Sequence, residues 1–208
     1  MKQNLKIKVC GLKFTANREA VEKLPLDFLG FIFYPESKRF VGKNPESGLF
    51  NTTQQKVAVF VDEAVSEIFN IVQDFGFEYV QLHGKEKPET CRILKDRGIK
   101  VIKAFNLNEH FDFSSLEAYE DHVYFFLFDT KTYLPGGSGE KFNWDILKSY
   151  SGENLFFLSG GIKPEDTEKI RHFYHPKLFG IDLNSGFEDE PGLKNIRVLS
   201  ELIDRVNR

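Results

Sequence analysis

Eight apolar segments of strand length are distributed along the chain, and most are continuous rather than alternating. They lie at residues 5–9, 28–34, 56–61, 79–82, 100–105, 123–128, 155–158 and 178–183. Continuous runs rich in β-branched and aromatic residues are typical of strands buried on both faces, as in a parallel sheet covered by helices. Between them, apolar residues recur three and four positions apart, which predicts helices at 64–75, 88–97, 164–174 and 194–206.

The spacing of the predicted strands favours a closed barrel. Their carboxyl ends recur about every 25 residues, the length of one strand plus one crossover helix, and eight such units close a (β/α)8 barrel. An open dinucleotide-binding sheet would need fewer strands and a G-x-G-x-x-G motif, which is absent after the first strand. We therefore predict that residues 1–208 form a single α/β domain, a (β/α)8 TIM barrel of minimal length compared with the roughly 250 residues typical of the fold.

Two connections match this pattern poorly. Residues 35–55 are rich in Pro, Gly, Ser and Asn, so we expect a short or distorted second helix, with part of the segment in a helical turn or a functional loop. Residues 106–119 mark the fifth helix only weakly. We place no domain boundary at either connection.

Composition and charge exclude several classes of protein. The chain has 28 Lys plus Arg against 31 Asp plus Glu, a net charge of −3, and lacks the basic surface that a nucleic acid partner requires. No apolar run approaches the roughly 18 residues needed to span a membrane. The first ten residues alternate like a strand and show no secretory signal, so we expect a cytoplasmic protein. Two cysteines are too few for a disulfide framework and should remain thiols.

In this fold the site is built at the carboxyl ends of the strands, so polar residues that directly follow an apolar run are the candidates. The rule selects five single residues, Cys10, Asp62, His83, Asp129 and Asp182. It also selects three glycine-rich segments, at 135–139, 159–161 and 184–186.

Glycine-rich loops follow both the seventh and the eighth predicted strand. Plain turns could explain either loop alone, but a pair at these two strands predicts a phosphate site built from backbone N–H groups. Its candidate residues are Gly160, Gly161, Ser185 and Gly186. The run at 135–139 has the wrong glycine-to-lysine spacing for a nucleotide-binding P-loop.

Cys10 and Asp129 end the first and sixth predicted strands, where a thiol and a carboxyl group could face a small substrate from two sides. Cys10 could instead be a small buried apolar residue, and Asp129 a helix cap. His83 is interpreted as a hydrogen-bonded scaffold residue, and no partner at ligand spacing suggests a metal. Arg39 is either a solvated loop charge or a clamp for a carboxylate. Cys91, within a predicted helix, is expected to be structural.

Taken together, the blocks that contain these residues resemble the phosphoribosylanthranilate isomerase family in order and spacing. The resemblance covers essentially the whole chain. Its blocks include KVCGL at 8–12, LGFIFY at 29–34 with SKRFV at 37–41, VQLHG at 80–84, FDT at 128–130, LSGGIKPE at 158–165 and GIDLNSGFE at 180–188.

The resemblance implies a cofactor-free Amadori rearrangement of N-(5-phosphoribosyl)anthranilate in tryptophan biosynthesis, with a small-molecule substrate and no metal. It implies that Asp129 is the general acid, Cys10 the general base and Arg39 the group that binds the anthranilate carboxylate. We expect His83 and Asp182 to contact the substrate, and the glycine-rich loops at 159–161 and 184–186 to hold its phosphate. We expect backbone dipoles and an uncrowded site to favour the thiolate of Cys10.

The resemblance leaves some points open. Asn184 stands where a serine is more usual, which puts a hydroxyl contact to phosphate in doubt but leaves the backbone donors intact. The family contains monomers and homodimers, and the sequence does not decide between them. A histidine-pathway isomerase of the same fold would use an aspartate in place of Cys10, and a non-catalytic phosphate-binding barrel would need neither Cys10 nor Asp129.

Overall fold

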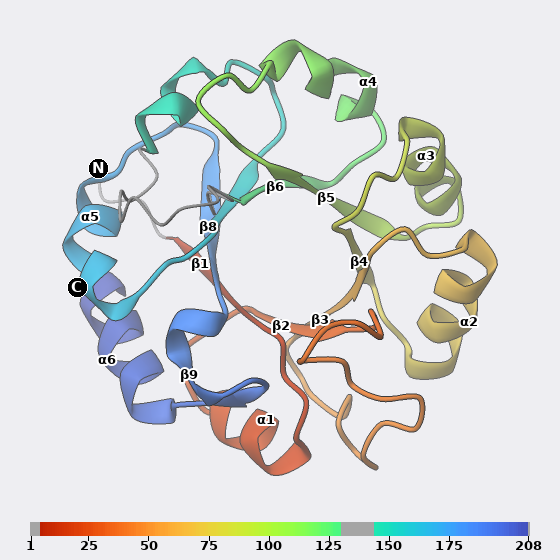
Figure 1. Ribbon diagram of the computed structural model, residues 1–208, viewed down its shortest axis with the longest axis vertical. Helices are drawn as coiled ribbons and strands as arrows, with labels where there is room; N and C mark the ends of the chain where they lie inside the picture. The colour runs from red at the N-terminus through yellow and green to blue at the C-terminus, as the bar shows by residue number, and fades with distance from the viewer. Residues whose placement is uncertain (1–4, 130–143, 208) are drawn as a thin grey trace.

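The computed structural model describes residues 5–129 and 144–207, and its centre is a closed barrel of eight parallel strands in sequence order (Figure 1). The predicted fold class is confirmed. The strands are β1 (Lys6–Cys10), β2 (Phe28–Ile32), β3 (Gln55–Phe60), β4 (Tyr79–Leu82), β5 (Lys100–Asn106), β6 (Phe125–Asp129), β7 (Phe156–Ser159) and β8 (Leu178–Leu183). Each overlaps one of the predicted segments, because buried parallel strands give uninterrupted apolar runs.

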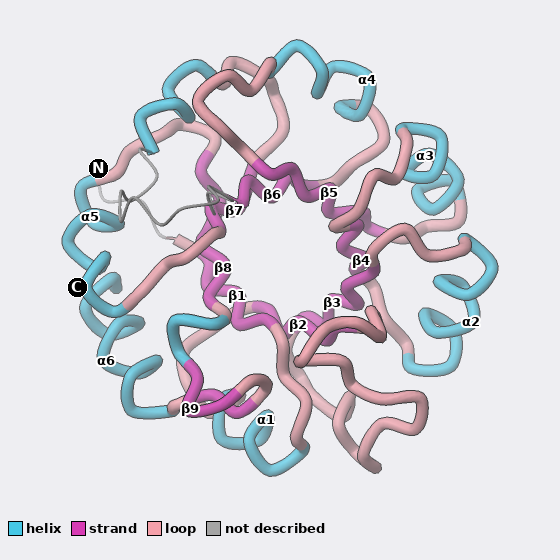
Figure 2. The backbone as a smooth tube through the Cα atoms, viewed as in Figure 1, coloured by secondary structure: helices cyan, strands magenta, loops and turns pink. Residues whose placement is uncertain are grey.

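Helices surround the barrel (Figure 2). They are α1 (Thr15–Val21), α2 (Val65–Phe75), α3 (Pro88–Asp96), α4 (Glu117–Glu120), α5 (Thr167–His172) and α6 (Ile196–Asn207). Short 3₁₀ turns are η1 (Phe113–Leu116), η2 (Trp144–Ser149), η3 (Pro164–Asp166) and η4 (Ser185–Phe187). The predicted helix at 164–174 is split into η3 and α5, and the one at 194–206 begins later, because a small hairpin of β9 (Glu188–Glu190) and β10 (Leu193–Lys194) precedes α6.

No helix lies between β2 and β3, so the short second helix expected at 35–55 is wrong, whereas the alternative of turns in a loop that reaches the site agrees with the structure. A loop of consecutive turns replaces it, and its Leu49 and Phe50 fill the space that a helix would cover. The Phe50 ring lies 5.1 Å from the ring of Phe31 and 4.7 Å from that of Phe75. Proline and glycine break the helical period there, while two apolar side chains suffice to complete the core.

Helix α1 fixes this loop in place. Arg18 donates to the carbonyl of Gly48, and Glu22 accepts hydrogen bonds from the Thr52 hydroxyl and the Thr53 N–H. These contacts matter for the site because the same loop carries Arg39.

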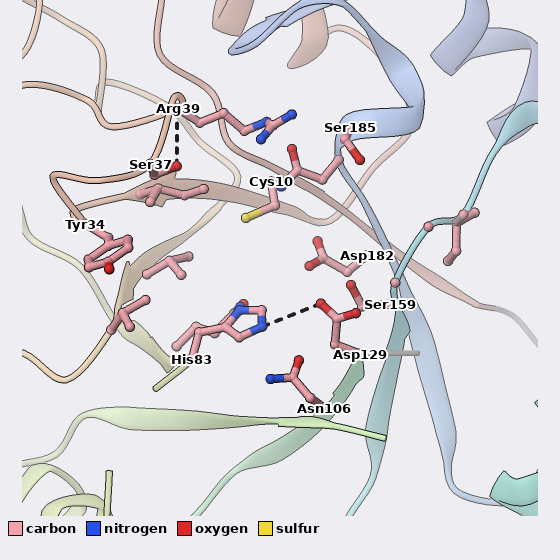
Figure 3. Close-up of a pocket in the computed structure, with 18 residues that line it drawn as sticks. Cys10, Tyr34, Ser37, Arg39, His83, Asn106, Asp129, Ser159, Asp182 and Ser185 are labelled. Atoms are coloured by element: carbon pink, nitrogen blue, oxygen red, sulfur yellow. Dashed lines mark hydrogen bonds and ion pairs between the residues drawn. The ribbon is translucent and has the colours of Figure 1, made fainter. Parts of the chain in front are cut away.

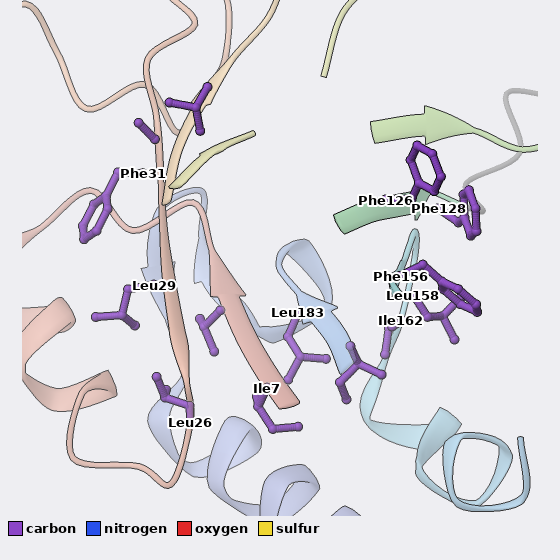
Figure 4. Close-up of a cluster of buried hydrophobic side chains, with 14 of the residues drawn as sticks. Ile7, Leu26, Leu29, Phe31, Phe126, Phe128, Phe156, Leu158, Ile162 and Leu183 are labelled. Atoms are coloured by element: carbon purple, nitrogen blue, oxygen red, sulfur yellow. The ribbon is translucent and has the colours of Figure 1, made fainter. Parts of the chain in front are cut away.

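The hydrophobic core has two parts. One lies between the strands and the surrounding helices (Figure 4). The other fills the barrel at the amino ends of its strands, where the Phe28 ring meets Tyr79 and Phe157 edge-on at 5.4 Å each. This aromatic cluster fills the amino end of the barrel, and the cavity lies at the opposite end, where the strands have their carboxyl ends.

Candidate active site

A cavity of about 490 Å³ lies at the carboxyl ends of the strands (Figure 3). Its volume is in the range of small-molecule sites. The structure brings nearly all the predicted site residues into its lining: Cys10, Arg39, His83, Asp129, Gly160, Gly161, Asp182 and Ser185. Asp62, which the strand-end rule also selected, instead accepts a hydrogen bond from the Lys85 N–H, in the loop after β4. The segment 135–139 lies outside the described residues.

Cys10 ends β1, and its neighbour across the strand pair is Gly30 of β2. A Cβ atom at Gly30 would lie 2.7 Å from the Cys10 sulfur, so this glycine provides the space for the thiol. The side chain is only 3% exposed, and burial raises the pKa of the Cys10 thiol, although the charges of Lys8 and Lys194 oppose the rise. The expectation that an open site favours the thiolate is therefore wrong for the free protein, because the site is buried and desolvates the charge.

Asp129 ends β6 and faces His83, which follows β4 (Figure 3). The His83 Nε2 lies 3.5 Å from the Asp129 Oδ2, and the Gln81 amide nitrogen lies 3.0 Å from His83 Nδ1. The Gln81 side-chain amide therefore holds one ring nitrogen of His83, and the other ring nitrogen faces the Asp129 carboxyl group. Gln81 is 1% exposed, and sequence reasoning missed it, although its position two residues before His83 places both on one face of the strand.

Asp182 lies on β8, in register with Lys8 of β1. The Lys8 Nζ is 2.9 Å from the Asp182 Oδ1, and their side chains are 0% and 5% exposed. Burial raises the pKa of Asp182, and the charge of Lys8 opposes this rise. Asp182 thus lines the cavity as predicted, but its carboxylate is also half of a buried ion pair that the sequence did not reveal.

Arg39 crosses the rim of the cavity and is held by Glu188. The Arg39 Nε lies 2.9 Å from Glu188 Oε1, and Nη2 lies 2.5 Å from Oε2. Lys194 also contacts Glu188, at 2.7 Å, and donates to the Asn184 side-chain oxygen at 2.8 Å. Burial works against the charge of Glu188, but hydrogen bonds from Arg39 and the charge of Lys194 lower the pKa of this carboxyl group.

This arrangement orients Arg39 and leaves part of its guanidinium available. Among the described residues, no partner is found for Arg39 Nη1, so the edge of the planar guanidinium that contains Nη1 remains for a carboxylate ligand. Glu188 and Lys194 were missed at the level of sequence. Their signal was weak, because they lie on the small hairpin beyond the eighth strand rather than at a strand end.

The two glycine loops lie against each other at the ends of β7 and β8. Gly160 and Gly161 have φ values of 94° and 64°, a backbone conformation that side-chain-bearing residues rarely adopt. A Cβ atom at Gly186 would lie 2.3 Å from the Ile162 carbonyl oxygen, so close approach of the loops requires glycine there. Such turns present backbone N–H groups to an anion.

Neither a cluster of possible metal ligands nor a membrane-spanning helix is found in the part of the chain that the structure describes. Residues 5–129 and 144–207 contain no group of three or more His, Cys, Asp or Glu side chains placed to hold a metal ion. None of the helices in these ranges is long and apolar enough to cross a membrane.

Fold and site together define a (β/α)8-barrel enzyme with a thiol, a carboxyl group and an oriented arginine around one small-molecule cavity. Residues 7–205 match the family model described as N-(5'phosphoribosyl)anthranilate (PRA) isomerase. The chain therefore belongs to the N-(5'-phosphoribosyl)anthranilate isomerase family, whose members act in tryptophan biosynthesis.

Individual relatives agree over nearly the full chain. The isomerase of Parabacteroides distasonis is 46% identical over 204 residues, which cover 96% of this chain and 92% of the relative. The solved isomerase of Thermotoga maritima has a TM-score of 0.81 at 30% identity, covering 97% of this chain and 98% of its own. The Thermus thermophilus isomerase also has a TM-score of 0.81, at 28% identity, with the same coverage.

Proposed function

We propose that this chain converts N-(5-phosphoribosyl)anthranilate into 1-(2-carboxyphenylamino)-1-deoxy-D-ribulose 5-phosphate, with Cys10 as general base and Asp129 as general acid. The observation that carries the assignment is that both side chains line one cavity, whose rim also carries Arg39 and the two glycine loops. A solved family member at 26% identity was crystallised with the reduced form of this product, which supports the same substrate class here.

The substrate has an anion at each end, and the cavity offers a matching group at each side. The anthranilate carboxylate would bind the guanidinium of Arg39 that Glu188 orients. The phosphate would bind backbone N–H groups of the loops that contain Gly160, Gly161, Ser185 and Gly186. These two contacts place the ribose between Cys10 and Asp129, and fixed orientation of this kind supplies much of the rate enhancement of many enzymes.

The first step is ring opening. Asp129 donates its proton to the furanose ring oxygen, the bond from that oxygen to C1 breaks, and the nitrogen lone pair forms a C1=N double bond. The His83 ring N–H, 3.5 Å from the carboxylate, would stabilise the negative charge that Asp129 then carries.

The second step is proton removal from C2. The thiolate of Cys10 takes this proton, the bonding electrons form a C1=C2 double bond, and the positive charge on nitrogen is neutralised. Transfer of the C2 hydroxyl proton to C1 gives the ketone. C1 is reduced and C2 is oxidised within one molecule, so the electron balance closes without an external oxidant or reductant, and we propose a cofactor-free reaction.

We further infer that residues 1–208 form one domain, because the barrel closes between β1 and β8. Both cysteines are free and buried, and a thiol that acts as a base must stay reduced, which supports a cytoplasmic site of action. The ligand that we propose is a small phosphate ester.

The proposal is tested by mixing the protein with freshly generated phosphoribosylanthranilate and following the loss of anthranilate-type fluorescence. We expect turnover well above the spontaneous rate. A protein that binds inorganic phosphate but gives no acceleration would be a non-catalytic barrel, and turnover of only the histidine-pathway substrate would assign the chain to that reaction.

A further inference from the structure

Lys8 is a charged residue inside the barrel, directly below the proposed base. It precedes Cys10 by two residues on β1, so the two side chains lie on the same face of the strand. Its side chain is fully buried, and its ammonium donates to the Asp182 carboxylate at 2.9 Å and also interacts with the Cys10 thiol through charge and hydrogen bonding.

A second buried ion pair shows what a structural lysine looks like in this protein. Lys103 and Glu86 lie 3.1 Å apart and are 2% and 3% exposed. Lys103 also donates to three backbone carbonyls, and Glu86 accepts from the N–H groups of Asp62 and Gly84. This pair ties loop backbones together, whereas Lys8 binds no backbone group among the described residues.

Stability alone does not explain the Lys8 pair. Replacing a buried ion pair by apolar side chains of similar volume is often neutral or stabilising, because the desolvation cost of two charges is large. An apolar pair could therefore fill this position of the barrel equally well. What apolar side chains could not provide is an electric field at the neighbouring sulfur.

Charged and titratable groups from several elements face that sulfur. They are Lys8 on β1, Asp182 on β8 and Lys194 on β10, with Arg39, His83 and Asp129 on other sides of the cavity. Burial raises the pKa of the Cys10 thiol, Lys8 lowers it through charge and hydrogen bonding, and Asp182 raises it. Burial works against the charge of Lys8 too, but Asp182 and Cys10 raise the pKa of this lysine, so it remains an ammonium ion.

We propose that Lys8 is an electrostatic positioning residue for Cys10: its ammonium, held by Asp182, stabilises the thiolate that removes the substrate proton. The catalytic consequence rests on the proposed function, in which Cys10 is the base. The effect of Lys8 on the thiol itself is a property of the protein without substrate.

The test is a titration of Cys10 by the ultraviolet absorbance of its thiolate, in a Cys91→Ala background that removes the other thiol. Lys8→Met is expected to raise the pKa of the Cys10 thiol by about one unit or more. At pH values where this thiol is mostly protonated in both proteins, that is a tenfold loss of thiolate. Asp182→Asn is expected to lower it, because the carboxylate that opposes the thiolate is gone. Lys103→Met, which removes a buried lysine of the structural pair, is the matched control and should leave the Cys10 titration unchanged.

Opposite signs for Lys8→Met and Asp182→Asn distinguish a field effect from structural damage, which would shift both variants the same way. If Lys8→Met does not fold, the Lys8→Met/Asp182→Asn double variant carries no lone buried charge and is compared with Asp182→Asn alone. Its thiol pKa should be higher. An unchanged or lower thiol pKa on removal of Lys8, in either background, overturns the proposal.

Activity provides a separate readout. In Lys8→Met, kcat/KM at a fixed pH below the thiol titration of both proteins should fall, because a smaller fraction of Cys10 is thiolate. A thiol titration that shifts while kcat/KM stays unchanged would leave the role of Lys8 intact but show that Cys10 is not the base. Wild-type activity with no shift of the thiol would reject Lys8 and leave the proposed function intact.

Discussion

Replacing Gly186 with alanine tests whether the two glycine loops bind phosphate as one unit. The new methyl group would lie 2.3 Å from the Ile162 carbonyl oxygen and 3.3 Å from the Lys163 Cα. Because carbon and oxygen atoms approach to only about 3.3 Å in weak C–H···O contacts, the loops must separate by about 1 Å. Backbone atoms form the obstacle, so no side-chain rotation can relieve it.

The expected consequence follows from this displacement. A shift of about 1 Å in a positioning group can lower activity about 100-fold, so we expect kcat/KM of Gly186→Ala to fall by roughly this factor. Overpacking of this kind costs about 1–3 kcal/mol in the free energy of unfolding, which leaves a folded barrel. The measurements are steady-state kinetics and the rise in Tm that inorganic phosphate gives to the substrate-free protein, which should be smaller in the variant.

Gly98→Ala is the matched control. Gly98 has a φ of 82° and no atom within 4 Å of an added Cβ, and it lies in the turn after α3, away from the cavity. It should lower stability by about 1–2 kcal/mol through backbone strain alone and leave kcat/KM unchanged. Wild-type kinetics and phosphate stabilisation in Gly186→Ala would refute the role that we assign to the loops.

Three further predictions follow from the site and its surroundings. Arg39→Ala should raise KM about 10- to 100-fold with little change in kcat, as expected for loss of a charge-assisted contact worth about 1.5–3 kcal/mol; an unchanged KM would remove Arg39 from substrate binding. Because burial raises the pKa of Cys10, the thiolate absorbance of the Cys91→Ala protein should titrate above the range of a free cysteine, and a titration at or below that range would contradict this. Lys103→Met leaves the buried Glu86 carboxylate without its ammonium partner and three carbonyls without the lysine donor, so urea unfolding should show a loss of about 3–5 kcal/mol, and a loss below about 1 kcal/mol would contradict the structural role.

The barrel could be predicted from the sequence because each strand is buried on both faces. Continuous apolar runs such as the one at 123–128 mark such strands directly, and their even spacing gives the closed topology. The connection between β2 and β3 could not be predicted. Whether Leu49 and Phe50 are carried by a helix or by turns depends on contacts with β2 and α2 that are distant in sequence.

The site could be predicted only as far as strand ends reveal it. Cys10 and Asp129 follow apolar runs and were found, but Lys8 lies within a strand and looks like an ordinary solvent-facing lysine. Only closure of the barrel buries it beside Asp182. The same closure desolvates Cys10, which is why its protonation was predicted in the wrong direction.

The most direct test of the proposed acid–base pair is kcat of Cys10→Ala and of Asp129→Asn in the phosphoribosylanthranilate assay, with Cys91→Ala as the control thiol variant. Positioned proton transfer contributes about 10²- to 10⁴-fold, so each of the two site variants should lose on the order of that factor. Cys91→Ala should keep wild-type kcat, because Cys91 is a buried residue of α3. An unchanged kcat in either Cys10→Ala or Asp129→Asn would contradict the assignment.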